Sequence, residues 1–70
     1  MTTTEASTLW LAYDAEGRVA GTIRKADGTY TVTMAGADKS LGAYPAMEIA
    51  KKALHAHMPP GSDWPQFREH

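Results

Sequence analysis

Three histidines have the side chains with the most versatile chemistry in this chain, because imidazole binds metals and exchanges protons near neutral pH. His55 and His57 fall in a segment with helical periodicity, and His70 ends the sequence. Two residues apart on a helix, side chains diverge by about 200°, whereas helical metal ligands are spaced by three or four residues. We therefore expect no metal site, and interpret His55 as solvated and His57 as a residue at a helix end.

The serines and carboxylates form no catalytic pattern. None of the three serines lies in a Gly-x-Ser-x-Gly context, the sequence has no cysteine, and its glycines are too scattered to form a phosphate-binding loop. The acidic residues near strand ends fall in predicted turns, where hydrogen bonds to the backbone explain them: Asp14, Glu16, Asp27 and Asp38. We therefore expect no catalytic residue, no cofactor and no enzymatic activity.

Length and composition limit the class of protein. A chain of 70 residues that is 43% hydrophobic and 21% charged is long enough for one small domain and too apolar to be disordered throughout. The longest apolar run, Leu9–Tyr13, is far shorter than the roughly 20 residues of a membrane span or the apolar stretch of a secretory signal. We expect a cytoplasmic protein that does not enter membranes. The net charge of −1 predicts no long-range attraction to a polyanion.

Periodicity divides the chain into three parts. Residues 1–7 show no apolar repeat and are predicted to be a disordered N-terminus. Residues 8–58 carry strand and helix patterns and are predicted to form a β-β-β-(β)-α domain. Residues 59–70 begin with Pro59-Pro60-Gly61, which ends the helix, and form a tail that contains prolines and aromatic residues.

The strand signals lie in the first half of the domain. Strands are predicted at Thr8–Tyr13, from Arg18 to about Lys25, and at Thr29–Ala35, where β-branched and aromatic residues alternate. Ala26-Asp27-Gly28 is typical of a three-residue hairpin loop in which a type I turn is followed by a left-handed glycine. The segment Lys39–Tyr44 is predicted to add a short edge strand.

A single amphipathic helix follows and is predicted to begin near Pro45, a residue suited to a first helical position. Its apolar positions recur at helical spacing, at Ala46, Ile49, Ala50, Ala53, Leu54 and His57. The fold class is therefore α+β, a three- to four-stranded antiparallel meander packed on one face by a single C-terminal α-helix. One helix can cover only one face of the sheet, so the other face must meet solvent, the tail or a partner.

Strand alternation assigns side chains to the two faces. We expect the helix, through Ile49, Ala53 and Leu54, to meet one set of strand residues: Leu9, Leu11, Val19, Ile23, Tyr30, Val32, Met34 and Leu41, with Tyr13 as a further candidate for this core. The opposite face would then hold Trp10, Arg18, Thr22, Arg24, Thr31 and Thr33. A register error of one residue would exchange the two sets.

Three interpretations of this uncovered face remain open. Trp and Arg are enriched at interaction hot spots, so the face could bind a protein. The arginines could instead track phosphates while Trp10 stacks on bases, or Trp10 could simply pack on the stems of Arg18 and Arg24. In the tail, Trp64 and Phe67 either fold back onto the domain or form a docking motif; folding back is favoured because a small core gains much from each buried aromatic residue.

The run Leu41-Gly42-Ala43-Tyr44-Pro45-Ala46-Met47-Glu48-Ile49-Ala50 resembles the strand-to-helix junction of AP2-like domains and of the arm-binding domains of phage tyrosine integrases. Gly28-Thr29-Tyr30-Thr31-Val32 is similar to their Gly-x-aromatic-x-Val strand. The resemblance implies a three-stranded sheet with a helix behind it and a sheet face laid into the DNA major groove. Carried over, the DNA-contacting residues would be Arg18, Thr22, Arg24, Thr31 and Thr33.

From these patterns we expect a small non-enzymatic binding module. Its partner would be another protein, held by the uncovered sheet face or by the aromatic tail. The alternative is an AP2-like domain that binds DNA through the same face. A second copy of the chain is a further candidate partner, because the uncovered face and the sheet edges invite pairing. The small size also suits a phage-encoded or accessory protein.

Overall fold

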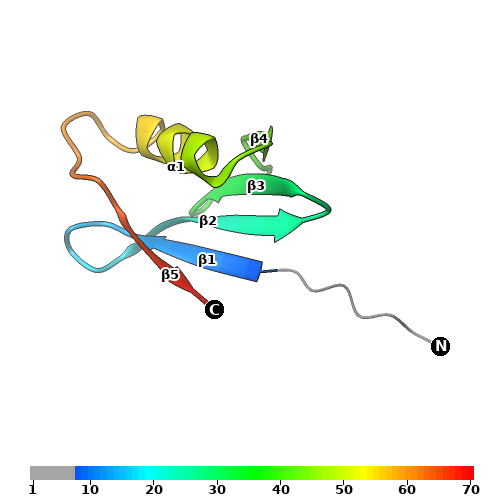
Figure 1. Cartoon of the computed structure of the whole chain (residues 1–70). Coiled ribbons are helices and arrows are strands. Elements are labelled where there is room, and N and C mark those ends of the chain that lie inside the picture. The colour runs from blue at the N-terminus through cyan, green and yellow to red at the C-terminus, as the bar shows by residue number, and fades with distance from the viewer. Residues whose placement is uncertain (1–7) are drawn as a thin grey trace.

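This computed structural model describes residues 8–70, which contain five strands and one helix (Figure 1). Their order is β1 (Thr8–Tyr13), β2 (Val19–Ala26), β3 (Thr29–Met34), β4 (Gly42–Tyr44), α1 (Met47–Ala56) and β5 (Gln66–Glu69). The predicted disordered N-terminus, residues 1–7, lies outside the described residues.

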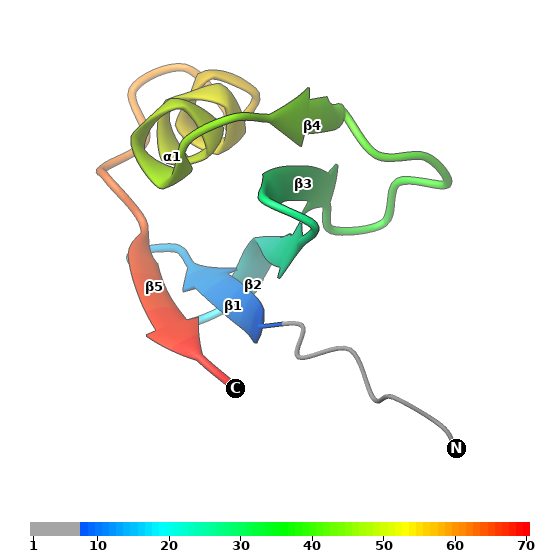
Figure 2. The same cartoon turned by 45° about the vertical axis from the view of Figure 1, so that its right-hand side comes forward.

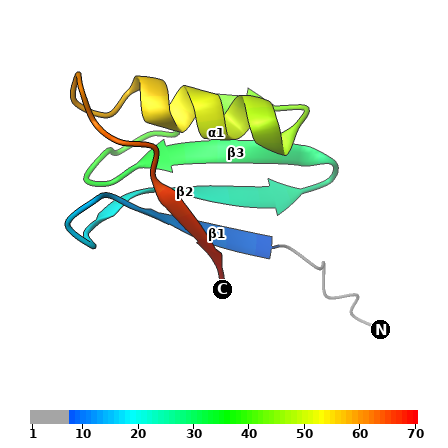
Figure 3. The ribbon, with the colours of Figure 1, turned by 60° about the vertical axis from the view of Figure 1, so that its left-hand side comes forward.

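The strands form one antiparallel sheet in the order β4-β3-β2-β1-β5. The helix α1 lies on one side of this sheet, across β2, β3 and β4 (Figure 3). Figure 2, turned so that the strands are seen more nearly end-on, shows the twist that carries the sheet from β4 at one edge to β5 at the other. The predicted α+β class with one covering helix is confirmed. The sheet has five strands, whereas three or four were predicted.

The C-terminal tail supplies that fifth strand. β5 pairs antiparallel with β1 from Tyr13↔Gln66 to Trp10↔Glu69, and the His70 N–H donates to the Leu9 carbonyl over 2.7 Å. The prediction that the tail folds back onto the domain is confirmed for these residues. The pairing has a physical cause, because without it β1 would be an edge strand with one side of its backbone unpaired.

The hairpin between β2 and β3 is tighter than predicted. Ala26 pairs directly with Thr29, so only Asp27 and Gly28 form the loop. Both have positive φ, 53° and 76°, which is the conformation of a type I′ turn rather than of a three-residue loop. The type I′ turn is favoured because its twist matches that of the flanking strands, and Asp-Gly is among the few pairs that adopt it readily.

The helix begins at Met47, two residues later than predicted, since Ala46 is an extended N-cap (φ −142°) without a side-chain cap. Ala50 and Leu54 are buried, and Met47 and Met58 pack beside them. Ile49 is 46% exposed, so its predicted place in the core is wrong. Met47 and Met58 contact the core in place of Ile49, and their unbranched side chains are suited to filling irregular space.

Candidate interaction face

Strand register fixes which side chains share each face of the sheet, because directly opposed residues in antiparallel strands point the same way. The buried residues Ile23 and Val32 are opposed, and they mark the face covered by α1. We call the other side the open face. The strand pairs assign to it Leu9, Leu11, Tyr13, Val19, Thr22, Arg24, Thr31, Thr33, Ala43, Gln66 and Arg68.

Trp10 is not on the open face, and its predicted placement there is wrong. It is opposed to Ile23 and packs against the core, with its ring centroid 6.2 Å from that of Tyr30. The error has a simple origin, because β1 is apolar at every position from Leu9 to Tyr13 and therefore carries no alternation from which to read its faces. The bulky ring reaches over to Tyr30 on the covered side, and Leu9 and Leu11 are left on the open side.

Val19 and Arg18 also lie elsewhere than predicted. The register shifts between Ala12 and Tyr13, so that Ala20 packs against the core while Val19 is 41% exposed. This irregularity reverses the alternation at the start of β2, and the expected burial of Val19 is wrong. Arg18 precedes β2 in a loop, where it is exposed and lies 3.8 Å from Glu16.

The four remaining predicted sheet residues do share the open face. Thr22 is opposed to Thr33, and Arg24 is opposed to Thr31. The threonines are half-buried and Arg24 is exposed. The alternation within β3 predicted the positions of Thr31 and Thr33 correctly, because one side of that strand is fully apolar and the other fully polar.

Three residues that the sequence interpretation placed in or near the core line the open face instead. Leu9, Leu11 and Tyr13 follow one another along β1 and are each half-buried; we call them the β1 stripe. One feature of the sequence is consistent with Leu9, Leu11 and Tyr13 pointing to the open face. Ala12 and Gly21 are small and opposed to each other, which suits the side on which a helix approaches closely.

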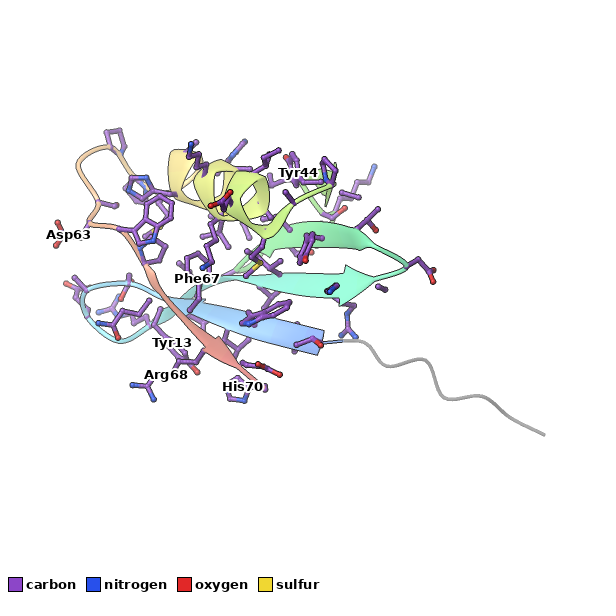
Figure 4. The ribbon with its side chains drawn as sticks, in the orientation of Figure 1. Tyr13, Tyr44, Asp63, Phe67, Arg68 and His70 are labelled. Carbon is purple, nitrogen blue, oxygen red and sulfur yellow. The ribbon has the colours of Figure 1, made fainter. Side chains whose placement is uncertain are left out.

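Arginines lie on both sides of the β1 stripe. Arg24 on β2 is opposed to Leu9, and Arg68 on β5 is opposed to Leu11. Figure 4 shows Arg68, Tyr13 and His70 on the side of the sheet away from α1, and Phe67 on the side of the helix. Among the paired strand residues of the open face, Arg24 and Arg68 are the charged side chains and none is a carboxylate.

The two tail aromatics have different environments. Phe67 is opposed to Ala12, packs half-buried against the core, and has the Lys51 Nζ 5.1 Å from its ring centroid. Trp64 is 52% exposed, with its ring 5.1 Å from that of His55. His55 itself is half-buried and donates from Nε2 to the Ser62 carbonyl over 2.9 Å, so the expectation that it is solvated is wrong. Phe67 is therefore structural, whereas one side of Trp64 is available.

His57 lies where it was predicted, at the end of α1. It is the C-cap residue, and its Nδ1 donates to the Ala53 carbonyl over 3.0 Å. Among residues 8–70, no three His, Cys, Asp or Glu side chains gather in an arrangement that could hold a metal ion.

An open groove of about 640 Å³ continues the β1 stripe beyond Tyr13. Its walls include Tyr13, Arg68 and Gln66 from the open face, and Asp63 and Trp64 from the segment before β5. Asp14 also borders it, but its Oδ1 already accepts the N–H groups of Glu16 and Arg18, each over 2.9 Å. The stripe and the groove thus form one continuous surface that runs from Leu9 to Trp64.

In the described part of the chain, no helix has the length and apolar character needed to cross a membrane. Comparison with protein-family models, with curated proteins and with solved structures found no match to this chain. The AP2-like resemblance therefore stays a prediction, and the interpretation of the open face depends on its own chemistry.

Proposed function

We propose that this protein is a small binding module and that its open face receives another protein. The observation that carries the proposal is the β1 stripe, which places two leucines and a tyrosine, each half-buried, on the side of the sheet that α1 leaves uncovered. Apolar side chains bordered by arginines are typical of the centre of a protein interface, where charged residues other than Arg are depleted.

The energetics of such an interface are favourable. Removing apolar surface from water contributes about 25 cal/mol per Å², so completing the burial of the three half-buried side chains would contribute on the order of 1 kcal/mol each. Arg24 and Arg68 would add polar contacts at the border of the stripe. A binding energy of this kind is concentrated in few residues, as in hot spots of known interfaces.

Site-specific photocrosslinking in cells that naturally express the protein tests this proposal. A benzophenone side chain at Thr31 or Thr33 on the open face should give discrete protease-sensitive adducts. The same group at the exposed position Lys52, on α1, is the matched control. The adducts should disappear when Leu11→Lys is added. Equal labelling from Thr31 and Lys52 would contradict the use of the open face, and adducts joining two copies would identify the partner as the chain itself.

DNA is a second candidate ligand, favoured by the absence of carboxylates among the paired strand residues of the open face. Its arginines and threonines could contact phosphates and bases in the manner that the AP2-like resemblance implies. A titration with duplex DNA at two salt concentrations tests it. If DNA is the ligand, affinity falls steeply with salt, and combining Arg24→Ala with Arg68→Ala reduces both the affinity and its salt dependence. An affinity that is weak and unaffected by these substitutions would exclude the open face as a DNA site.

A further inference from the structure

We infer that a second groove, between the β1–β2 loop and the linker from α1 to β5, binds a linear aliphatic polyamine. This site is separate from the open face, so the inference goes beyond the proposed function and does not depend on it. It follows from the size of the groove, the aliphatic side chains that line it and the sign of the charges at its border.

The walls of this groove come from two segments that are far apart in the sequence. The loop between β1 and β2, residues 14–18, and the linker between α1 and β5, residues 57–65, lie at the same end of the sheet (Figure 1). Both segments line a groove of about 600 Å³, which we call the loop groove. Its volume is in the range of roughly 300–1,000 Å³ that is usual for small-ligand sites.

The apolar lining of the loop groove is aliphatic. Met58 is buried, Ala20 and Met34 pack partly buried against the core, and the exposed residues Ala35 and Pro59 complete the lining. None of the described residues that line it is a phenylalanine, tyrosine or tryptophan, whereas quaternary ammonium ligands are recognised through aromatic faces. An aliphatic surface instead suits a chain of methylene groups, as when the stems of lysine side chains lie on apolar surface.

The formally charged side chains that line the loop groove are carboxylates, those of Asp14, Glu16 and Asp63. Arg18 lies 3.8 Å from Glu16 and offsets part of its charge, so the argument depends on Asp14 and Asp63. Arg68 lines the groove beside the open face and does not line this one. The border of the loop groove is therefore complementary to a cation, and carboxylate oxygens form short, charge-assisted hydrogen bonds with ammonium groups.

Local hydrogen bonds hold both carboxylates in place. The Asp14 Oδ1 accepts two backbone N–H groups of its own loop, each over 2.9 Å, which leaves Oδ2 outside these two bonds. Asp63 follows Ser62, whose N–H and Oγ both donate to the Pro59 carbonyl, over 3.1 and 2.6 Å. A site with walls that are already ordered loses less conformational entropy on binding, which favours the capture of a small ligand.

Two carboxylates on different segments favour a polyamine over other cations. A ligand that pairs with both Asp14 and Asp63 needs two cationic groups joined by a chain, which a polyamine provides and a single lysine side chain does not. A lysine-rich peptide would also bring backbone N–H and C=O groups to an aliphatic lining that cannot pair with them. Mg²⁺ prefers a nearly octahedral set of oxygens, and within residues 8–70 no three His, Cys, Asp or Glu side chains are arranged to hold a metal ion.

Titration of spermidine into the full chain at low ionic strength tests the inference. We expect calorimetry to detect binding that weakens as salt is added, because salt screens exposed charges. The methyl NMR signals of Met34 and Met58, which line the loop groove, should shift, whereas that of Met47, at the other end of α1, should not. Mg²⁺ and choline at the same concentration should bind more weakly, because the first has no methylene chain and the second is recognised through aromatic faces.

Removal of the two carboxylate charges should weaken the binding of spermidine. Combining Asp14→Asn with Asp63→Asn should reduce the affinity about tenfold, because an exposed ion pair contributes up to about fivefold. Asparagine at position 14 keeps the Oδ1 that accepts the N–H groups of the loop. The matched control combines Asp38→Asn with Glu48→Gln, which changes the net charge equally at exposed positions that do not line the loop groove. It should leave the affinity within about twofold, since screening limits the effect of distant exposed charges.

Circular dichroism would establish that both double variants are folded. A further variant, Ala35→Lys, tests the site without changing the loop that Asp14 holds. Ala35 is an exposed residue of the lining, so its replacement by lysine adds a cation to the groove and keeps both carboxylates. It should weaken the binding of spermidine to a similar extent, because like charges in one site repel each other.

Several results would overturn the inference. They are failure of spermidine to bind, binding that leaves the methyl signals of Met34 and Met58 unmoved, equal binding of Mg²⁺ or choline, and an equal loss of affinity in the control variant. Tighter binding of a lysine-rich peptide than of spermidine would also overturn it, since a protein would then supply the ammonium groups. The proposed function is tested separately by photocrosslinking from Thr31, because no paired strand residue of the open face lines the loop groove.

Discussion

Gly21→Ala is the substitution that tests the assignment of the two faces most directly. A Cβ atom built on Gly21 would lie 2.8 Å from the Thr33 carbonyl oxygen, 3.2 Å from the Leu54 Cδ1 and 3.3 Å from the Met34 Cα. Two of these are backbone atoms of the neighbouring strand, which cannot rotate away. Overpacking of this kind costs about 1–3 kcal/mol, while replacing glycine in a strand returns about 0.5–1 kcal/mol.

The two ranges give a net loss of about 1 kcal/mol in the free energy of unfolding, with limits of about 0 and 2.5 kcal/mol, and each kcal/mol lowers Tm by roughly 4–8 °C for a domain of this size. Urea and thermal unfolding, followed by circular dichroism, would measure it. Ala43→Ser is the matched control, because it also adds one heavy atom to a strand residue, at an exposed position on the open face. Its cost should stay within about 0.5 kcal/mol. If Gly21→Ala is as stable as the original chain, Leu54 does not sit over Gly21 and the face assignment is refuted.

Three further substitutions separate structural from binding residues. Trp10→Ala should lower the free energy of unfolding by about 2 kcal/mol, since the side chain is half-buried against the core, and should leave the photocrosslinks from Thr31 intact in the folded fraction. Loss of these crosslinks without loss of stability would contradict this role. Phe67→Ala should cost about 1–2 kcal/mol and accelerate hydrogen exchange of the Leu11 and Tyr13 amides, which face β5; unchanged exchange would contradict the docking of the tail. Arg18→Ala should change stability by less than about 0.5 kcal/mol in urea unfolding, because its contact with Glu16 is long and exposed, and a larger loss would point to a role that this contact does not explain.

The clearest local patterns in the sequence predicted the elements well. The first strand has the predicted bounds, Thr8–Tyr13, and the β2–β3 hairpin forms around Asp27 and Gly28. The face of Thr31 and Thr33 also followed from the sequence, because β3 alternates strictly and a register slip would bury every threonine. These features depend on residues within a few positions of one another, so the sequence alone could specify them.

The rotation of α1 and the irregular start of β2 could not be predicted in this way. The helix buries Ala50 and Leu54 and leaves Ile49 exposed, since Met58 from beyond the helix completes the core. Val19 is exposed because the β1–β2 register shifts, and that shift depends on two strands together.

Local sequence patterns were enough to specify the type and order of the elements up to α1, the position of the turn between β2 and β3, and the polar side of β3. The direction in which the side chains of β1 point depends on long-range contacts, because an all-apolar strand satisfies local preferences in either register and Trp10 packs against Tyr30 on the covered side. The tertiary structure also placed Arg68 beside Leu11, since the pairing of β5 with β1 joins residues more than fifty positions apart. The β1 stripe and its flanking arginines, which carry the proposed function, arise from these two long-range contacts.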